Sequence, residues 1–124
     1  MSMHILVVDD DRAVRESLAR SLQYSGYEVD SAADGVEALA HLSGTHPDAV
    51  IMDVMMPRLD GYQTCALIKN NSEFKGTPVI MLSSKDGLFD KAKGRIVGSD
   101  QYLTKPFGKS ELLDAIEQYA SQGA

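Results

Sequence analysis

Short apolar runs alternate with helix-forming segments along the whole chain, and this alternation restricts the fold more than any other feature. Five runs have the length and composition of strands: His4–Val8, Glu28–Ala32, Ala49–Met52, Val79–Leu82 and Gln101–Leu103. Between and after them, apolar residues recur at helical spacing in Arg12–Ser25, around Val36–Ala40, in Tyr62–Asn70, in Asp86–Val97 and around Leu112–Tyr119. Strands that alternate with helices form a parallel sheet with helices on both faces. The sequence therefore predicts an α/β fold.

The size and composition of the chain exclude several classes of protein. Its 124 residues, 44 % of them apolar, suit one folded domain covering residues 1–124. No apolar run approaches the roughly 18 residues that span a bilayer, and the N-terminus resembles no signal peptide. Cys65 is the only cysteine, so no internal disulfide forms. A net charge of −6 argues against nucleic-acid binding. We therefore expect a cytoplasmic protein that neither enters membranes nor binds nucleic acid directly.

Polar and charged residues follow the strands at their carboxyl ends. Asp9 and Asp10 follow the first strand, and Asp53 follows the third. Ser83 comes directly after the fourth strand, and Lys105 lies two residues beyond the fifth. The carboxyl ends of parallel strands meet at one edge of the sheet, where sites in such folds form. If the first and third strands are neighbours, the three carboxylates converge.

Three ionised carboxylates in close proximity require a cation, or some of them must be protonated. Oxygen ligands without a nearby histidine or cysteine select a hard ion, Mg²⁺ or alternatively Mn²⁺. The bland alternative is a solvated acidic loop that caps the next helix. For Asp11, which directly precedes a helical segment, the role of N-cap or first-turn acid is the better interpretation.

Four segments, LVVDDDR, DAVIMDVMMPRLDG, TPVIMLSS and DQYLTKPF, occur in an order and at a spacing that resemble the receiver domains of two-component response regulators, the CheY-like domains. The resemblance covers nearly the full length. It implies a flavodoxin-like (βα)5 doubly wound parallel sheet with strand order 2-1-3-4-5.

The resemblance also implies a chemical role for each site residue. Asp53 resembles the phosphoacceptor, which takes a phosphoryl group from a sensor histidine kinase or a phosphotransfer protein. Asp9, Asp10, Asp53 and the backbone carbonyl of Met55 match the Mg²⁺ ligands. Lys105 and Ser83 match the residues that contact the phosphoryl oxygens. A cis peptide bond before Pro106 is implied as well.

The resemblance further implies a switch with an output surface. Ser83 and Tyr102 match the switch pair, and a downstream protein partner is expected on the fourth helix, fifth strand and fifth helix. From the residues alone, a half-buried strand aromatic is the better interpretation of Tyr102. The basic cluster of Lys85, Lys91, Lys93 and Arg95 is either a docking surface or a solvated helix face. We expect a monomer or a weak dimer.

Three alternatives stay open at this point. Up to about Pro57 the chain resembles OmpR-type receivers, and from about Arg58 it resembles stand-alone receivers of twitching motility. It could be a hybrid of two receivers or one natural sequence. It could also be an aspartyl-phosphate phosphatase of the haloacid-dehalogenase type, although Met55 stands where that family has a second acid. The last alternative is a receiver that no longer accepts phosphate, which the intact set of site residues disfavours.

Overall fold

The computed structural model describes residues 3–84 and 87–120 and contains every predicted strand and helix. The strands are β1 His4–Val8, β2 Glu28–Ala32, β3 Ala49–Asp53, β4 Val79–Ser83 and β5 Gln101–Thr104. The helices are α1 Arg12–Tyr24, α2 Gly35–Gly44, α3 Gly61–Lys69, α4 Leu88–Ile96 and α5 Lys109–Ala120. The predicted start of the fourth helix at Asp86 and the predicted basic residue Lys85 lie outside the described residues.

All five strands are parallel and lie in the order β2-β1-β3-β4-β5, which confirms the expected doubly wound topology. Their registers align the carboxyl ends. Val8 of β1 pairs with Met52, and Asp53 pairs with Leu82. Ser83 in turn pairs with Thr104 of β5. The residues that follow these strands therefore emerge along one edge of the sheet.

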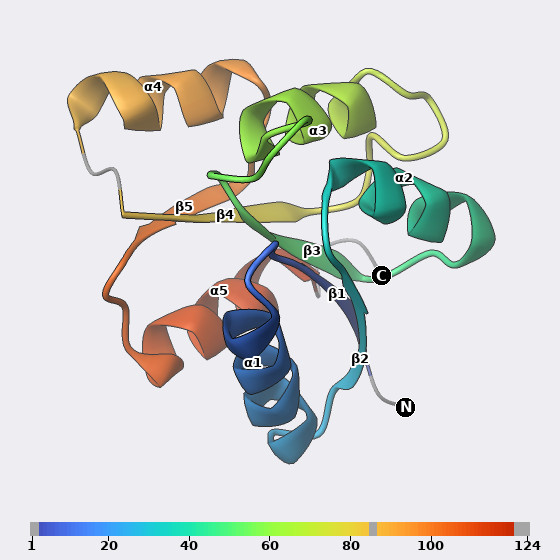
Figure 1. Cartoon of the computed structure of the whole chain (residues 1–124), viewed down its shortest axis with the longest axis vertical. Helices are drawn as coiled ribbons and strands as arrows, with labels where there is room; N and C mark the ends of the chain where they lie inside the picture. The colour runs from blue at the N-terminus through green and yellow to red at the C-terminus, as the bar shows by residue number, and fades with distance from the viewer. Residues whose placement is uncertain (1–2, 85–86, 121–124) are drawn as a thin grey trace.

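Helices cover both faces of the sheet, with α1 and α5 on one side and α2, α3 and α4 on the other (Figure 1). Each face has its own apolar core. Leu6 and Val8 of β1 pack into the core beneath α2 and α3, while Ile5 and Val7 pack into the core on the opposite side. Because successive side chains of a strand point to opposite faces, a strand covered on both sides must be apolar at every position. This explains the continuous apolar runs in the sequence.

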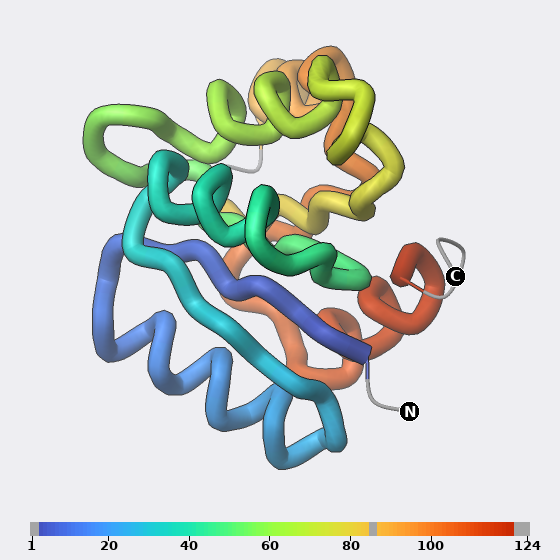
Figure 2. Tube along the Cα trace, turned by 90° about the vertical axis from the view of Figure 1, so that its right-hand side faces the viewer, coloured from blue at the N-terminus to red at the C-terminus, as the bar shows by residue number. Residues whose placement is uncertain are grey.

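The Cα trace in Figure 2 shows the helices packed along the strands. Within the described ranges, no helix has both the length and the apolar character that crossing a bilayer requires.

Candidate functional site

Three carboxylates converge at the carboxyl edge of the sheet, two directly after β1 and one at the end of β3. One oxygen each from Asp9, Asp10 and Asp53 lies within 4.8 Å of the other two. Asp9 is 2 % exposed and Asp53 is 7 % exposed, whereas Asp10 faces solvent. β1 and β3 are hydrogen-bonded neighbours, so the convergence expected from the sequence is present in the structure.

Hydrogen bonds hold Asp9 in place, but one of its carboxylate oxygens has no partner among the described residues. Its backbone N–H donates to the carbonyl of Ala32 at 3.2 Å, and its Oδ1 accepts from the backbone N–H of Asp11 at 2.9 Å. Its Oδ2 is buried and has no hydrogen-bond partner among the described residues. A buried polar atom without a partner costs about 1–3 kcal/mol, so the atom is suited to a ligand.

Burial also raises the pKa of both buried acids. For Asp9 the pKa is raised by loss of solvation, opposed by the hydrogen bond from Asp11, and raised further by the charge of Asp53. For Asp53 burial again raises the pKa, while the charge of Lys105 and its hydrogen bond lower it. A divalent cation would reverse this effect because it stabilises the ionised carboxylates. The donors are all hard oxygens, so the residues fit Mg²⁺ or Mn²⁺.

Asp11 belongs to helix α1 rather than to the acid cluster. Its Oδ1 accepts a hydrogen bond from the backbone N–H of Val14 at 3.1 Å, and it is the N-cap residue of α1. The cap predicted for Asp11 is therefore confirmed.

Lys105 reaches the same edge from the end of β5. Its Nζ donates to Oδ1 of Asp53 at 3.2 Å, and its backbone N–H donates to the carbonyl of Ser83 at 2.7 Å. Ser83 is fully buried at the end of β4. The peptide bond between Lys105 and Pro106 is cis, as the resemblance implied. A cation, an acid and a hydroxyl residue thus come from three adjacent strands.

The loop between β3 and α3 bends sharply back toward the sheet. The N–H of Gly61 donates to the carbonyl of Val54 at 2.9 Å, and a Cβ on Gly61 would lie only 2.5 Å from the carbonyl oxygen of Asp53. Only glycine permits this approach. In this loop, Met55 is half exposed and Met56 is buried.

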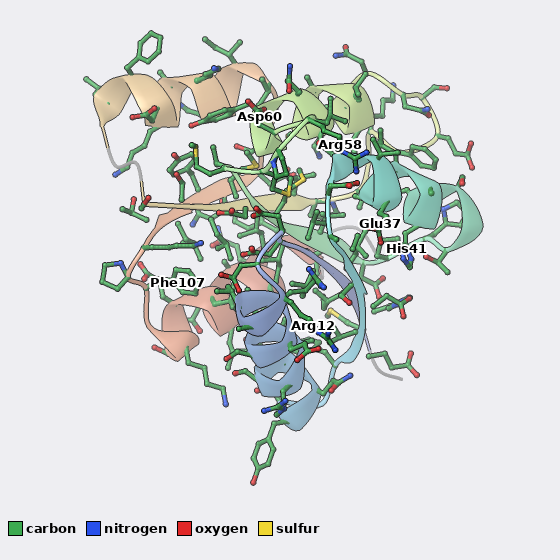
Figure 3. All side chains as sticks on the ribbon, viewed as in Figure 1. Arg12, Glu37, His41, Arg58, Asp60 and Phe107 are labelled. Carbon is green, nitrogen blue, oxygen red and sulfur yellow. The ribbon has the colours of Figure 1, made fainter. Side chains whose placement is uncertain are left out.

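An ion pair that the sequence did not indicate connects this loop to α2. The guanidinium of Arg58 contacts the carboxylate of Asp34, the N-cap residue of α2. Figure 3 shows Arg58 beside the start of that helix. Arg58 has a φ of 67°, a conformation that non-glycine residues rarely adopt. No sequence signal marks this pairing, because the two residues are 24 positions apart.

Tyr102 of β5 is hydrogen-bonded to a second tyrosine that sequence reasoning missed. The hydroxyl of Tyr62 on α3 donates to the carbonyl of Asp90 on α4 at 3.1 Å. The two tyrosine hydroxyls are also 3.1 Å apart, so Tyr102 supplies the hydrogen of their bond. Lys93 of α4 places its Nζ 4.7 Å from the centre of the Tyr62 ring. Tyr62 therefore connects α3, α4 and β5.

Space and protonation both favour this arrangement. Gly94 of α4 makes room for the Tyr102 ring, since a Cβ there would lie 2.9 Å from Cδ2 of Tyr102. Burial raises the pKa of the Tyr62 hydroxyl. Tyr62 consequently keeps its proton at neutral pH and can donate.

Comparison with known families agrees with this geometry. The profile of the response regulator receiver domain matches residues 5–117. The chain belongs to this family. A receiver domain is a signalling module of response regulators rather than an enzyme of the usual kind, and its CheY-like fold is the one described above.

Three similar proteins illustrate the relationship. Protein PilG of Pseudomonas aeruginosa is 63 % identical over 117 residues, which cover 94 % of this chain and 87 % of PilG. The response regulator MprA of Mycobacterium bovis is 50 % identical over 113 residues, which are 91 % of this chain but only 48 % of MprA. This receiver thus spans about half the length of MprA and of the other MprA proteins that it matches.

The third is a solved structure, the receiver domain of the sensor histidine kinase PA1611 from Pseudomonas aeruginosa. It has a TM-score of 0.89 and 28 % sequence identity, and the superposition covers 98 % of this chain and 99 % of that one. That structure has a magnesium ion coordinated in its active site cleft. Together with the acid cluster, this supports a divalent-metal site in the receiver described here.

The relationship to PilG bears on the hybrid hypothesis. A match over 94 % of the chain necessarily includes residues on both sides of the MMPRLDG segment, the suggested junction. A single relative therefore resembles both halves, and a hybrid origin stays a hypothesis.

Proposed function

We propose that this receiver domain is a phosphorylation switch whose acceptor is Asp53. The phosphoryl donor is the phosphohistidine of a sensor kinase or of a phosphotransfer protein. Asp9, Asp10, Asp53 and the backbone carbonyl of Met55 would hold Mg²⁺. The observation that carries the proposal is the convergence of Asp9, Asp10 and Asp53 within 4.8 Å, with Lys105 at 3.2 Å from the acceptor carboxylate.

In the proposed reaction, a carboxylate oxygen of Asp53 attacks the phosphorus atom of the phosphohistidine. A P–O bond forms while the P–N bond breaks, and the imidazole nitrogen keeps the electron pair. Lys105, which is paired with Asp53 beforehand, is close enough to transfer its hydrogen bond to a phosphoryl oxygen. When bound, Mg²⁺ supplies positive charge that offsets the negative charge of the phosphoryl group.

Phosphorylation places nearly two negative charges on the end of β3, next to the end of β4 and beside Lys105, which follows β5. We infer that Ser83 and Tyr102 respond to this charge and alter α4, to which Tyr102 is connected through Tyr62. The change is a shift between two populated packings.

The surface of α4 supports a role in binding a downstream protein. Leu88, Phe89 and Ile96 are each at least 80 % exposed. Exposed large apolar residues close together on a surface mark interaction sites. Beside them, Lys91 and Arg95 line a hollow of about 240 Å³ that continues to β5. We propose that this surface, together with β5 and α5, receives the partner.

The proposal is tested by labelling the protein with acetyl phosphate and Mg²⁺ and measuring intact mass. We expect one phosphoryl group per chain, lost in Asp53→Ala. The matched control, Asp114→Ala, removes an exposed acid of α5 and should label normally. Labelling that survives in Asp53→Ala contradicts the assignment of the acceptor. Repeated turnover of an added phosphoester would instead support the phosphatase alternative.

A further inference from the structure

Arg15 of α1 turns back toward the acid cluster and contacts its backbone. Its Nη1 donates a hydrogen bond of 2.8 Å to the carbonyl oxygen of Asp9. The side chain is half buried. Arg12 lies in the first turn of the same helix (Figure 3), but its side chain is 82 % exposed and pairs with Glu16. Two arginines of one helix thus differ in that only Arg15 is hydrogen-bonded to the acid segment.

The carbonyl that Arg15 holds belongs to the peptide unit joining Asp9 to Asp10. This unit is planar, so fixing its oxygen fixes the plane from which both side chains leave the backbone. Asp10 is exposed, and its side chain has no hydrogen bond to any of the described residues. The bond from Arg15 therefore constrains the relative positions of two carboxylates at once.

With the bond from Arg15, three of the four polar groups of Asp9 have hydrogen-bond partners. The N–H is bonded to Ala32, the carbonyl to Arg15 and Oδ1 to the N–H of Asp11. Oδ2 is the one polar atom of Asp9 without a partner among the described residues, and it is buried. With its other groups bonded, Asp9 cannot turn Oδ2 elsewhere without breaking a hydrogen bond. A ligand oxygen held in place before the ion arrives binds more tightly, because less freedom is lost on binding.

We propose that Arg15 is a positioning residue for the divalent-metal site, which it serves by fixing the Asp9–Asp10 peptide. The inference rests on the proposed function, in which these acids bind Mg²⁺. Simple electrostatics predicts the opposite influence, since a guanidinium near the site repels a cation. Removing Arg15 therefore changes the affinity for Mg²⁺ in opposite directions under the positioning explanation and under charge repulsion. Positioning predicts weaker metal binding, and charge repulsion alone predicts tighter binding.

The experiment is calorimetric titration of Mg²⁺ into the full chain, comparing wild type with Arg15→Met, Arg15→Lys and Arg12→Met. Arg15→Met keeps the length of the side chain without a donor, and we expect Kd for Mg²⁺ to rise about three- to tenfold, as for one lost hydrogen bond. Arg15→Lys retains a donor and should recover part of the affinity. Arg12→Met removes the same charge from the exposed position and should leave Kd within twofold of wild type.

Urea denaturation without metal establishes that each variant is folded. If Arg15→Met is not, Arg15→Gln replaces it, since its shorter side chain cannot reach the carbonyl and the same weakening is expected. Unchanged or tighter Mg²⁺ binding in a folded Arg15 variant overturns the proposal, as does equal weakening in Arg12→Met. Failure of wild type itself to bind Mg²⁺ at millimolar concentration would instead refute the proposed metal site.

Discussion

Replacing Tyr62 by phenylalanine removes one hydroxyl at the point where α3, α4 and β5 meet. The change deletes the hydrogen bonds to the carbonyl of Asp90 and to the hydroxyl of Tyr102. It leaves the ring in place, so the packing of Tyr62 and its contact with Lys93 are retained. The variant therefore isolates the two hydrogen bonds from the apolar contribution of this 6 % exposed side chain.

The structure gives a magnitude for this loss. Each hydrogen bond contributes about 0.5–1.5 kcal/mol net. Both partners of Tyr62 lie in half-buried residues, where water can replace part of what is lost. We therefore expect the free energy of unfolding to fall by about 1–2 kcal/mol. For a chain of this size the midpoint temperature should fall by about 4 °C for each kcal/mol. Because the bond to Asp90 ties the first turn of α4 to α3, the loss should be concentrated in α4.

Urea denaturation without Mg²⁺ measures the global effect, and amide hydrogen exchange measures its distribution. Amides of α4 should lose more protection than those of α5. Tyr24→Phe is the matched control, because the Tyr24 side chain is 90 % exposed and its hydroxyl should contribute almost nothing. The reasoning would be refuted if the free energy of unfolding of Tyr62→Phe were within about 0.3 kcal/mol of wild type and hydrogen exchange in α4 were unchanged. A difference that small is less than the contribution of a single hydrogen bond.

Three further predictions concern the site. In the metal-free protein, burial raises the pKa of Asp9 and Asp53 above the ordinary value of 3.8. Between that pH and their folded-state pKa values the folded state binds more protons than the unfolded state, so the free energy of unfolding falls as pH rises. Urea denaturation from pH 4 to 8 should show this decline, and Asp9→Asn should reduce it. Gly61→Ala places a Cβ 2.5 Å from a backbone oxygen and should cost about 1–3 kcal/mol, whereas Gly44→Ala meets nothing within 4 Å and should be neutral or slightly stabilising by the same denaturation assay. We hypothesise that the half-exposed side chain of Met55, two residues after Asp53, tunes the lifetime of the phosphoryl group. Met55→Asn should then change the rate at which the phosphorylated protein loses its phosphoryl group, and an unchanged rate would contradict the hypothesis.

The features that the sequence predicted correctly depend on local pattern. A strand buried on both faces must be apolar throughout, and β3 and β4 are buried at all five of their positions. Such strands stand out between amphipathic helices. Parallel strands bring their carboxyl ends together, and the resemblance supplied the strand order that makes the first and third strands neighbours. With that order, the sequence positions of Asp9 and Asp53 predicted that they meet. For the three helices predicted with both bounds, the bounds agree with the structure within two residues. The cap at Asp11 was predicted, whereas apolar periodicity did not reveal Asp60 as the cap of α3.

The contacts that the sequence did not predict join side chains from different elements. The bond between Tyr62 and Tyr102 spans 40 positions. In the sequence Tyr62 is simply an aromatic residue at the start of a helix, a common core position. Its partner depends on how α3 sits relative to β5, which is a result of how the three helices of that face pack together (Figure 1). Arg15 is similar, because helical periodicity places it on α1 but does not show that its side chain folds back to Asp9.

The acid cluster and the hydrogen bonds of Tyr62 have different consequences for a switch. The acid cluster opposes stability in the metal-free state, since Oδ2 of Asp9 has no partner in the part of the chain that the structure describes and both buried acids have a raised pKa. The Tyr62 contacts favour one position of α4 relative to β5. Lys105 lies between the two sites, because its Nζ is bonded to Asp53 and its backbone follows Tyr102 by three residues. Under the proposed function, a phosphoryl group on Asp53 competes for that Nζ. The free energy released at the acid cluster can therefore act on β5, and the strength of the Tyr62–Tyr102 bond determines how much of it is needed to move α4.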